Sequence, residues 1–165
     1  MPINSHKNGR IIILMTFIIA LSLSLLKIAG LSDYNPPWAM MVVIYWCLAI
    51  PNRVGIGTAW LVGLFVGFPG TSLLGVHALA FTITAYITLS LYQRIRISPP
   101  FQQAITIFCL LLLYSLLIHW FDGFSAENQD RTFTREFFYP ALVGFILWPL
   151  LFFILRGLRR RFKIS

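Results

Sequence analysis

The sequence is dominated by long apolar runs that carry almost no charge, and these runs limit the fold to one class. Six of them approach the roughly 20 residues that an α-helix needs to cross a bilayer, at about residues 11–31, 37–51, 54–70, 73–92, 101–121 and 137–155. Only 11% of the 165 residues are charged, whereas an average soluble domain has about 25%. The sequence therefore predicts an all-α membrane protein with six transmembrane helices in a single domain, residues 1–165. It excludes an ordinary soluble protein and a disordered chain.

The second and third runs are short and are joined only by Pro51, Asn52 and Arg53, which predicts a helical hairpin. About 14 residues at a rise of 1.5 Å cover roughly 21 Å of a hydrocarbon core about 30 Å thick. We therefore expect this hairpin to be bent or to span the membrane incompletely. The first run follows Lys7 and Arg10 and imitates a secretory signal peptide. Because no clear Ala-x-Ala cleavage site follows, we interpret it as a retained first span.

Lys and Arg residues gather on one side of the predicted membrane. Of the 13 basic residues, three lie on the side that has all five acidic residues, and ten lie on the other side. The ten are Lys7, Arg10, Arg53, Arg94, Arg96, Arg156, Arg159, Arg160, Arg161 and Lys163. Because cytoplasmic loops of membrane proteins are enriched in Lys and Arg, we expect both termini in the cytoplasm. This topology gives an outer loop at about 122–136 and a basic cytoplasmic tail at 156–165.

The basic tail and the net charge of +8 are consistent with two kinds of partner. Arg156, Arg159, Arg160, Arg161 and Lys163 are candidates for contact with anionic lipids or with an acidic cytoplasmic partner. No nucleic-acid-binding motif accompanies the charge, so we expect no nucleic acid partner.

A stripe of small residues runs along the third apolar run at four-residue spacing: Gly55, Ala59, Gly63 and Gly67. Residues at this spacing share one helix face. Small residues let two helix backbones approach closely, which favours helix association in lipid. The stripe predicts a close helix contact, either inside the fold or with another subunit.

A helix-breaking segment follows the stripe, with Pro69, Gly70, Ser72, Gly75 and His77 as its candidate functional residues. Proline and glycine end the preceding helix, and a serine hydroxyl can cap the next one. Such an outer turn can also line a ligand pocket, as broken helices do in transporters. Both interpretations stay open, and we expect His77 to have a polar interior or interfacial role.

Residues that could perform catalysis or hold a metal are missing from the apolar runs. No Asp, Glu or Arg lies in the middle of a run, which argues against ion-coupled transport. No Walker A, HExxH or GxSxG motif occurs, so none of these three catalytic patterns is present. Cys47 and Cys109 lie inside apolar runs without CxxC spacing, so we expect neither a disulfide nor a metal site. The sequence predicts a protein that is not an enzyme and binds no cofactor.

Several stretches of the chain together carry a family resemblance. They are Asn-Pro-Pro-Trp at 35–38, Tyr-Trp-Cys-Leu-Ala-Ile-Pro-Asn-Arg-Val-Gly-Ile-Gly-Thr at 45–58, Gly63, Gly-Thr-Ser-Leu-Leu-Gly-Val-His-Ala-Leu-Ala at 70–80, Leu-Trp-Pro at 147–149 and the basic tail from Arg156. In order and spacing, over nearly the whole chain, they resemble the MreD family of rod shape-determining proteins, especially its proteobacterial branch. The chain departs from this family at Gly67, because many members have an aspartate near the end of the third span.

The resemblance implies a component of the bacterial inner membrane that supports lateral peptidoglycan synthesis and regulates cell shape without being an enzyme. Family members bind MreC, a single-span periplasmic protein, and act with MreB, the glycosyltransferase RodA and the transpeptidase PBP2. The family is also similar to the six-helix substrate-binding components of energy-coupling factor vitamin transporters, which implies that fold here. As candidates for the MreC contact we name the small-residue stripe and the outer turn, so Gly63→Leu should weaken MreC co-purification.

Two other functions stay open on the residues alone. A vitamin-type substrate-binding component of a transporter needs polar side chains that converge from several spans, and the sequence offers Thr82, Thr84, Tyr86 and Ser115. A protein that handles a lipid-linked precursor needs a cationic pocket for a pyrophosphate, and we expect no clear one in the spans. A second copy of the chain also stays open as a partner.

Overall fold

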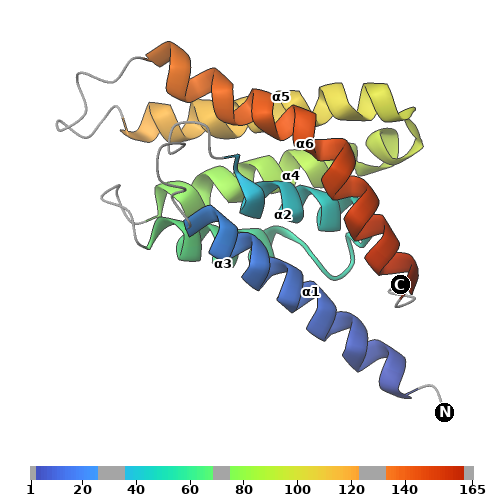
Figure 1. The fold of residues 1–165 in the computed structure, drawn as a ribbon. Coiled ribbons are helices and arrows are strands. Elements are labelled where there is room, and N and C mark those ends of the chain that lie inside the picture. Colours follow the sequence, from blue (N-terminus) through green and yellow to red (C-terminus); the bar gives the residue numbers. More distant parts are fainter. Residues whose placement is uncertain (1–2, 26–35, 69–74, 123–132, 162–165) are drawn as a thin grey trace.

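The computed structural model describes residues 3–25, 36–68, 75–122 and 133–161, and these residues form six α-helices (Figure 1). In chain order they are α1 (Ile3–Leu25), α2 (Trp38–Ala49), α3 (Ile56–Gly67), α4 (Val76–Ile97), α5 (Pro100–Asp122) and α6 (Phe133–Arg161). No strand occurs among the described residues. The expectation of an all-α chain with six helices is confirmed, and each helix overlaps one of the six apolar runs.

Some helices are longer than their apolar runs because arginines extend them. α4 continues to Ile97 instead of ending near residue 92, and α6 continues to Arg161. Arginine has a high helix propensity, and its charge is favourable at a helix C-terminus. Residues 156–161, expected as a tail, are therefore the last turns of α6, and residues 133–136, expected as outer loop, form its first turn. Residues 123–132 of the expected outer loop, 26–31 of the first run and 162–165 of the tail lie outside the described residues.

The helices differ in whether their length suffices to cross a membrane. α2 and α3 have 12 residues each, which gives about 18 Å at 1.5 Å per residue. Each is shorter than a hydrocarbon core of about 30 Å. In α5 and α6, the segments Phe101–Phe121 and Phe138–Arg161 are long and apolar enough to cross a membrane. Six complete spans therefore stay a prediction.

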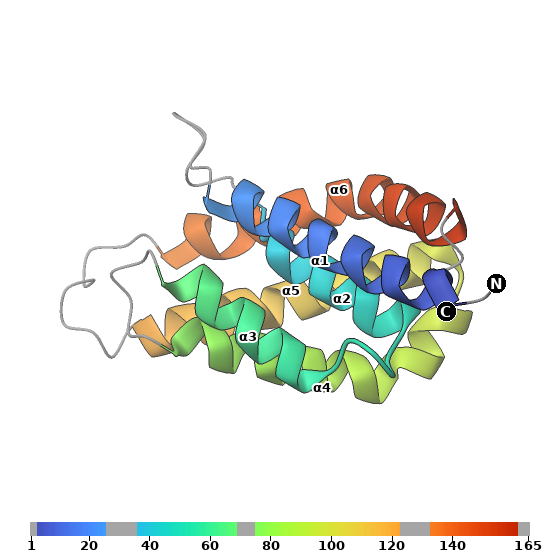
Figure 2. The ribbon, with the colours of Figure 1, turned by 90° about the horizontal axis from the view of Figure 1, so that it is seen from below.

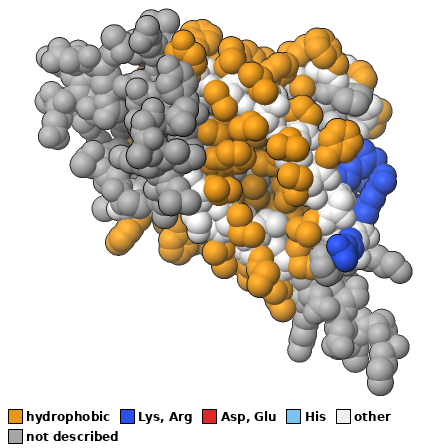
Figure 3. All heavy atoms as spheres, viewed as in Figure 1, with side chains coloured by type: hydrophobic (Ala, Val, Ile, Leu, Met, Phe, Trp, Pro, Cys, Tyr) orange, Lys and Arg blue, Asp and Glu red, His pale blue; other side chains and the backbone are white. Residues whose placement is uncertain are grey.

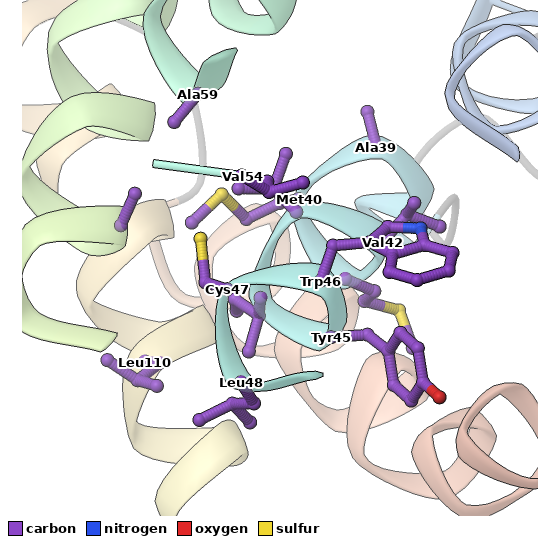
Figure 4. Close-up of a cluster of buried hydrophobic side chains, with 14 of the residues drawn as sticks. Ala39, Met40, Val42, Tyr45, Trp46, Cys47, Leu48, Val54, Ala59 and Leu110 are labelled. Carbon is purple, nitrogen blue, oxygen red and sulfur yellow. The ribbon is translucent and has the colours of Figure 1, made fainter. Parts of the chain in front are cut away.

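Helix α2 lies in the middle of the bundle, and the other five helices surround it (Figures 1 and 2). All of its residues from Ala39 to Ala49 are buried. A helix that is apolar on every side can be surrounded by protein or by lipid, and α2, which has no charged residue, is surrounded by the other helices. Met40, Trp46 and Cys47 are among the fully buried side chains of this cluster, which Figure 4 shows.

A side-chain hydrogen bond between Trp46 and Thr16 helps to fasten α1 to this centre. The Trp46 indole Nε1 donates to Thr16 Oγ1 at 3.0 Å, and the Thr16 hydroxyl donates to the Ile13 carbonyl at 2.7 Å. In α4, the buried hydroxyls of Thr84 and Thr88 donate to backbone carbonyls one turn earlier. Burying an unsatisfied polar group costs several kcal/mol in an apolar environment, so these bonds make the polar residues compatible with the core.

Helices α5 and α6 form an antiparallel pair on one side of α2, while α1 lies across α2 and α3 on the other side (Figures 1 and 2). Pro140 and Pro149 lie inside α6. A proline removes one backbone hydrogen bond and kinks a helix. The C-terminal half of α6 turns away from α5 in Figure 1, in accordance with this rule.

Large apolar side chains cover the outer surface of the bundle, as Figure 3 shows for one face. On α1, α3 and α6 they include Leu14, Ile18, Leu61, Phe65, Ile146 and Phe153, all exposed. Soluble monomers rarely expose contiguous apolar patches larger than a few hundred Å². An apolar exterior of this kind suits contact with lipid tails. Helices also suit this environment, because they satisfy their own backbone hydrogen bonds there.

Candidate functional site

Gly63 lies at the closest backbone contact between α3 and α4. A Cβ built on Gly63 would lie 2.7 Å from Ala78 Cα and 2.8 Å from the His77 carbonyl oxygen. Both are backbone atoms at the start of α4, so no side chain can rotate out of the way. Only glycine fits this contact, which is the reason for a small residue at this position in the stripe.

The other members of the stripe contribute unequally to this face. A Cβ on Gly67 would lie 3.3 Å from His77 Cβ, and Ala59 is completely buried. Gly55 precedes α3 as its N-terminal cap, and a Cβ there would meet nothing within 4 Å. Gly63 and Gly67 are thus covered by α4. This geometry supports the interpretation of helix packing inside the fold, whereas a partner at Gly63 would require α3 and α4 to separate.

The outer turn is only partly within the described residues, because Pro69, Gly70 and Ser72 lie outside them. Gly75 has a φ of 111° in the left-handed region and caps the start of α4. Glycine occupies this region without the steric cost that other residues pay. His77 is half-buried, and its Nδ1 lies 3.2 Å from the Tyr114 hydroxyl. The polar interior role expected for His77 takes the form of a link between α4 and α5.

A cavity of about 210 Å³ lies beside this link. Its polar lining residues include Ser24, Tyr114, Ser115 and His119. Ser24 Oγ accepts a hydrogen bond from the Ala39 amide at 3.1 Å, and His119 Nδ1 lies 3.0 Å from the Ser115 carbonyl. These groups already serve contacts within the protein.

The polar residues named for a vitamin-type pocket do not converge. Ser115 lines the 210 Å³ cavity. The hydroxyls of Thr82 and Thr84 donate to carbonyls of their own helix, and Tyr86 is exposed. Because two of the four hydroxyls are bonded to the backbone of α4 and Tyr86 points outward, the four residues form no common site.

Two apolar grooves flank α1, and the sequence alone gave no sign of them. One, of about 730 Å³, lies between α1 and α3 and is lined by Ile13, Leu14, Phe17, Ile18, Leu21, Thr58, Leu61, Val62 and Phe65, with Arg10, Asn52, Arg53 and Val54 at one end. The other, of about 370 Å³, lies between α1 and α6. Helix α1 forms one wall of both grooves, and its N-terminal end diverges from the bundle (Figure 1).

The basic residues of the expected tail lie on two different parts of α6. Arg156 and Arg159 line a pocket of about 240 Å³ together with Arg96 of α4. Arg160 and Arg161 are exposed and do not line this pocket, and Lys163 lies outside the described residues. These arginines lie beyond the expected spans 73–92 and 137–155, so the expectation of no clear cationic pocket in the spans is not contradicted. Arg96 and Arg156 are far apart in sequence, so the folded α4 and α6 are needed to bring them together.

The described residues form no set that resembles a catalytic or metal centre. Within residues 9–24, 36–68, 75–99, 101–121 and 138–161, whose side chains the structure describes, no group of three or more His, Cys, Asp or Glu side chains gathers. Cys47 is buried and Cys109 is exposed, and both are free thiols. Apolar helices, an apolar exterior and close helix packing define a multi-pass membrane protein.

Comparison with known proteins specifies which kind of membrane protein this is. Residues 5–158 match the family described as rod shape-determining protein MreD. The chain is also 34% identical over 157 residues to the rod shape-determining protein MreD of Haemophilus influenzae, which covers 92% of this chain and 93% of the relative. No solved structure matches the chain. The chain belongs to the MreD family, whose members are non-enzymatic membrane proteins that determine rod shape.

Proposed function

We propose that this protein binds MreC in the bacterial inner membrane and thereby supports lateral peptidoglycan synthesis. In this proposal it acts with MreB, RodA and PBP2 in the elongation complex, and its six helices span the membrane with both termini in the cytoplasm. Family membership supports the role in cell shape. The groove between α1 and α3 supports a role in binding a membrane partner.

The proposed orientation is supported by the positions of the basic segments. The start of α1, the link between α2 and α3, the end of α4 and the end of α6 lie at the same end of the bundle (Figures 1 and 2). These segments carry Arg10, Arg53, Arg94, Arg96 and the arginines at 156–161. A shared basic end is what the positive-inside rule requires of a cytoplasmic face.

The groove between α1 and α3 is the observation that carries the proposal. Its rims are exposed apolar side chains of both helices, among them Ile18 of α1 and Phe65 of α3. Its length follows the two helices, so a single transmembrane helix can lie along it with side chains in contact on both rims. In lipid, such an association gains from close packing and not from a hydrophobic force. MreC has a single span, which suits this groove.

The test compares two tryptophan variants that differ only in their position. Ile18 is 61% exposed and lines the groove, whereas Ile146 of α6 is 63% exposed and does not. Forcing extra volume into a packed contact costs about 1–3 kcal/mol, which corresponds to a roughly 5- to 140-fold weaker association. We expect Ile18→Trp to lower MreC recovery from mild detergent by this factor and Ile146→Trp to leave it unchanged. Equal MreC recovery with both variants would refute the groove as the binding surface.

A cross-linking experiment distinguishes direct contact from indirect loss. Leu14 lines the groove and is exposed. In a background with Cys47→Ala and Cys109→Ser, we expect Leu14→Cys to form a disulfide with a cysteine placed in the MreC span. The control is Ile146→Cys, which should form none. Cross-links of equal yield at both positions would indicate random collision in the membrane.

The alternative function, a small-molecule component of a transporter, is favoured by the 210 Å³ cavity near His77. Ligand pockets are usually about 300–1,000 Å³, so this cavity is small. Its polar groups also make contacts within the protein. We therefore place this function second, and a stoichiometric solute found by mass spectrometry of the purified protein would reverse the order.

A further inference from the structure

The basic pocket at the end of the bundle joins three arginines from two helices. Arg156 and Arg159 lie three residues apart on α6, a spacing that puts them on one face. Arg96 comes from the last turn of α4. The pocket holds about 240 Å³, and none of its described lining residues is acidic. Three like charges around one small space repel each other, and an anion in the pocket would offset that repulsion.

Aromatic side chains orient one of these arginines. The Arg156 Cζ lies 5.7 Å from the centre of the Phe152 ring, a cation–π contact. The Phe152 ring in turn meets Tyr45 edge to face, with the ring centres 5.9 Å apart. Figure 4 shows the Tyr45 side chain reaching away from the axis of α2. The Arg156 guanidinium therefore lies against the Phe152 ring, which in turn packs against the buried Tyr45 ring.

Two polar side chains from the core also reach the pocket. Gln103 of α5 is only 9% exposed, and Tyr45 is buried, yet both line the pocket. The Gln103 side chain makes no hydrogen bond to any described residue, and its amide atoms are not sealed from the pocket. A nine-tenths buried amide with a free donor beside three arginines is suited to an anionic oxygen atom.

The chemistry of the ligand follows from the type and place of these groups. Guanidinium groups bind phosphate through paired hydrogen bonds. The exposed Phe153 ring also lies next to the pocket, because its centre is 6.2 Å from that of Phe152, which lines the pocket. A ligand with a phosphate and apolar tails fits both features, and basic pockets between membrane helices bind lipid head groups. We propose that Arg96, Gln103, Arg156 and Arg159 bind the phosphate of an anionic phospholipid.

The test uses pairs of variants with equal loss of charge. Arg96→Gln with Arg156→Gln removes two pocket arginines, whereas Arg94→Gln with Arg160→Gln removes two exposed arginines of the same helix ends that do not line the pocket. Binding of phosphatidylglycerol is titrated by native mass spectrometry in a neutral detergent, with phosphatidylcholine as the reference lipid. We expect the pocket pair to lose at least about tenfold in phosphatidylglycerol affinity relative to the control pair. Equal losses in the two pairs would show that the lipid senses only the general surface charge.

A variant that leaves the charge unchanged distinguishes specific binding in the pocket from general electrostatic attraction. Gln103→Leu keeps every arginine, and we expect it to weaken phosphatidylglycerol binding about threefold or more through loss of the amide donor. Unchanged affinity would remove Gln103 from the proposal. Inorganic phosphate provides the last comparison: displacement of phosphatidylglycerol by millimolar phosphate would mean that the pocket takes a soluble phosphate and would overturn the lipid assignment. Lipid binding is measured without MreC, so its failure leaves the proposed partner contact untouched.

Discussion

Adding one methyl group at Gly63 tests the contact on which the α3–α4 pair depends. The added Cβ would lie 2.7 Å from Ala78 Cα, whereas ordinary van der Waals contact begins at 3.4 Å. Because the opposing atoms are backbone, α3 and α4 must move apart by roughly 0.7 Å. Overpacking of this kind costs about 1–3 kcal/mol. Subtracting the gain of roughly 0.5–1 kcal/mol from replacing a helical glycine leaves Gly63→Ala with a net loss of about 1 kcal/mol at the midpoints of the two ranges, and of at most about 2.5 kcal/mol.

Two other glycines of the same helix supply matched controls. A Cβ on Gly57 would meet nothing within 4 Å, so Gly57→Ala should leave stability unchanged or raise it by up to about 1 kcal/mol. Gly67 is intermediate, because its nearest neighbour is the His77 side chain at 3.3 Å and not backbone. We expect Gly67→Ala to cost less than Gly63→Ala. The expected order of the stability losses, Gly63→Ala above Gly67→Ala above Gly57→Ala, follows from the neighbours of each glycine, because the substitution itself is the same in all three.

The buried thiol of Cys47 provides the assay. Cys47 is fully buried and Cys109 is exposed, so a Cys109→Ser background leaves one thiol that a fluorogenic reagent reaches only on unfolding. A change of 1 kcal/mol shifts Tm by about 2–4 °C for a chain of this size. We expect Gly63→Ala to melt about 2–4 °C lower than the background in detergent for a loss of 1 kcal/mol, and at most about 10 °C lower, and we expect Gly57→Ala to melt at or above the background. If the two variants melt alike, the backbone contact between α3 and α4 is not as close as described.

The same thiol assay applies to three further variants. Thr16→Val leaves the Trp46 indole without its acceptor and should lower stability by about 1 kcal/mol. Thr16→Ser keeps the hydroxyl and should retain most of the stability. Equal melting temperatures of the two variants would refute a stabilising hydrogen bond between Trp46 and Thr16. Tyr114→Phe removes the 3.2 Å contact with His77 and should cost at most about 1 kcal/mol, with faster hydrogen exchange at the start of α4, and unchanged exchange would count against the link. Gly75→Ala forces a side chain into φ 111° and should cost about 1–2 kcal/mol, whereas a melt equal to the background would mean that Gly75 adopts another conformation.

The number and order of the helices could be predicted from the sequence because lipid-compatible segments need long apolar runs. The central position of α2 could not be predicted in this way. A run such as Ala39–Ala49 is apolar on every side whether lipid or protein surrounds it, so its composition does not distinguish the two environments. Only the contacts with five other helices show that α2 forms the core.

The candidate sites were likewise predictable where they depend on one helix, and not predictable where they depend on how the helices pack together. The four-residue spacing of Gly63 and Gly67 predicted close packing, because neighbours on one helix face are fixed by helix geometry. The opposing residue, Ala78, was not predictable, since the rotation of α4 relative to α3 depends on the whole bundle. The basic pocket escaped prediction for a related reason: Arg96 and Arg156 meet only after α4 and α6 both extend beyond their apolar runs.

Helix α1 determines the shape of both apolar grooves and is therefore the element through which partners can influence each other. It contacts α2 and α3, but among the described residues it has no backbone contact with α6. Hydrogen bonds at Thr16 and Ser24 hold it to α2. A partner helix that moves α1 away from α3 must narrow the groove beside α6, because both grooves share α1 as a wall. Thr16→Val loosens α1 from α2, and we therefore expect it also to change MreC recovery. Unchanged recovery would show that the hydrogen bond at Thr16 does not determine the width of the groove between α1 and α3.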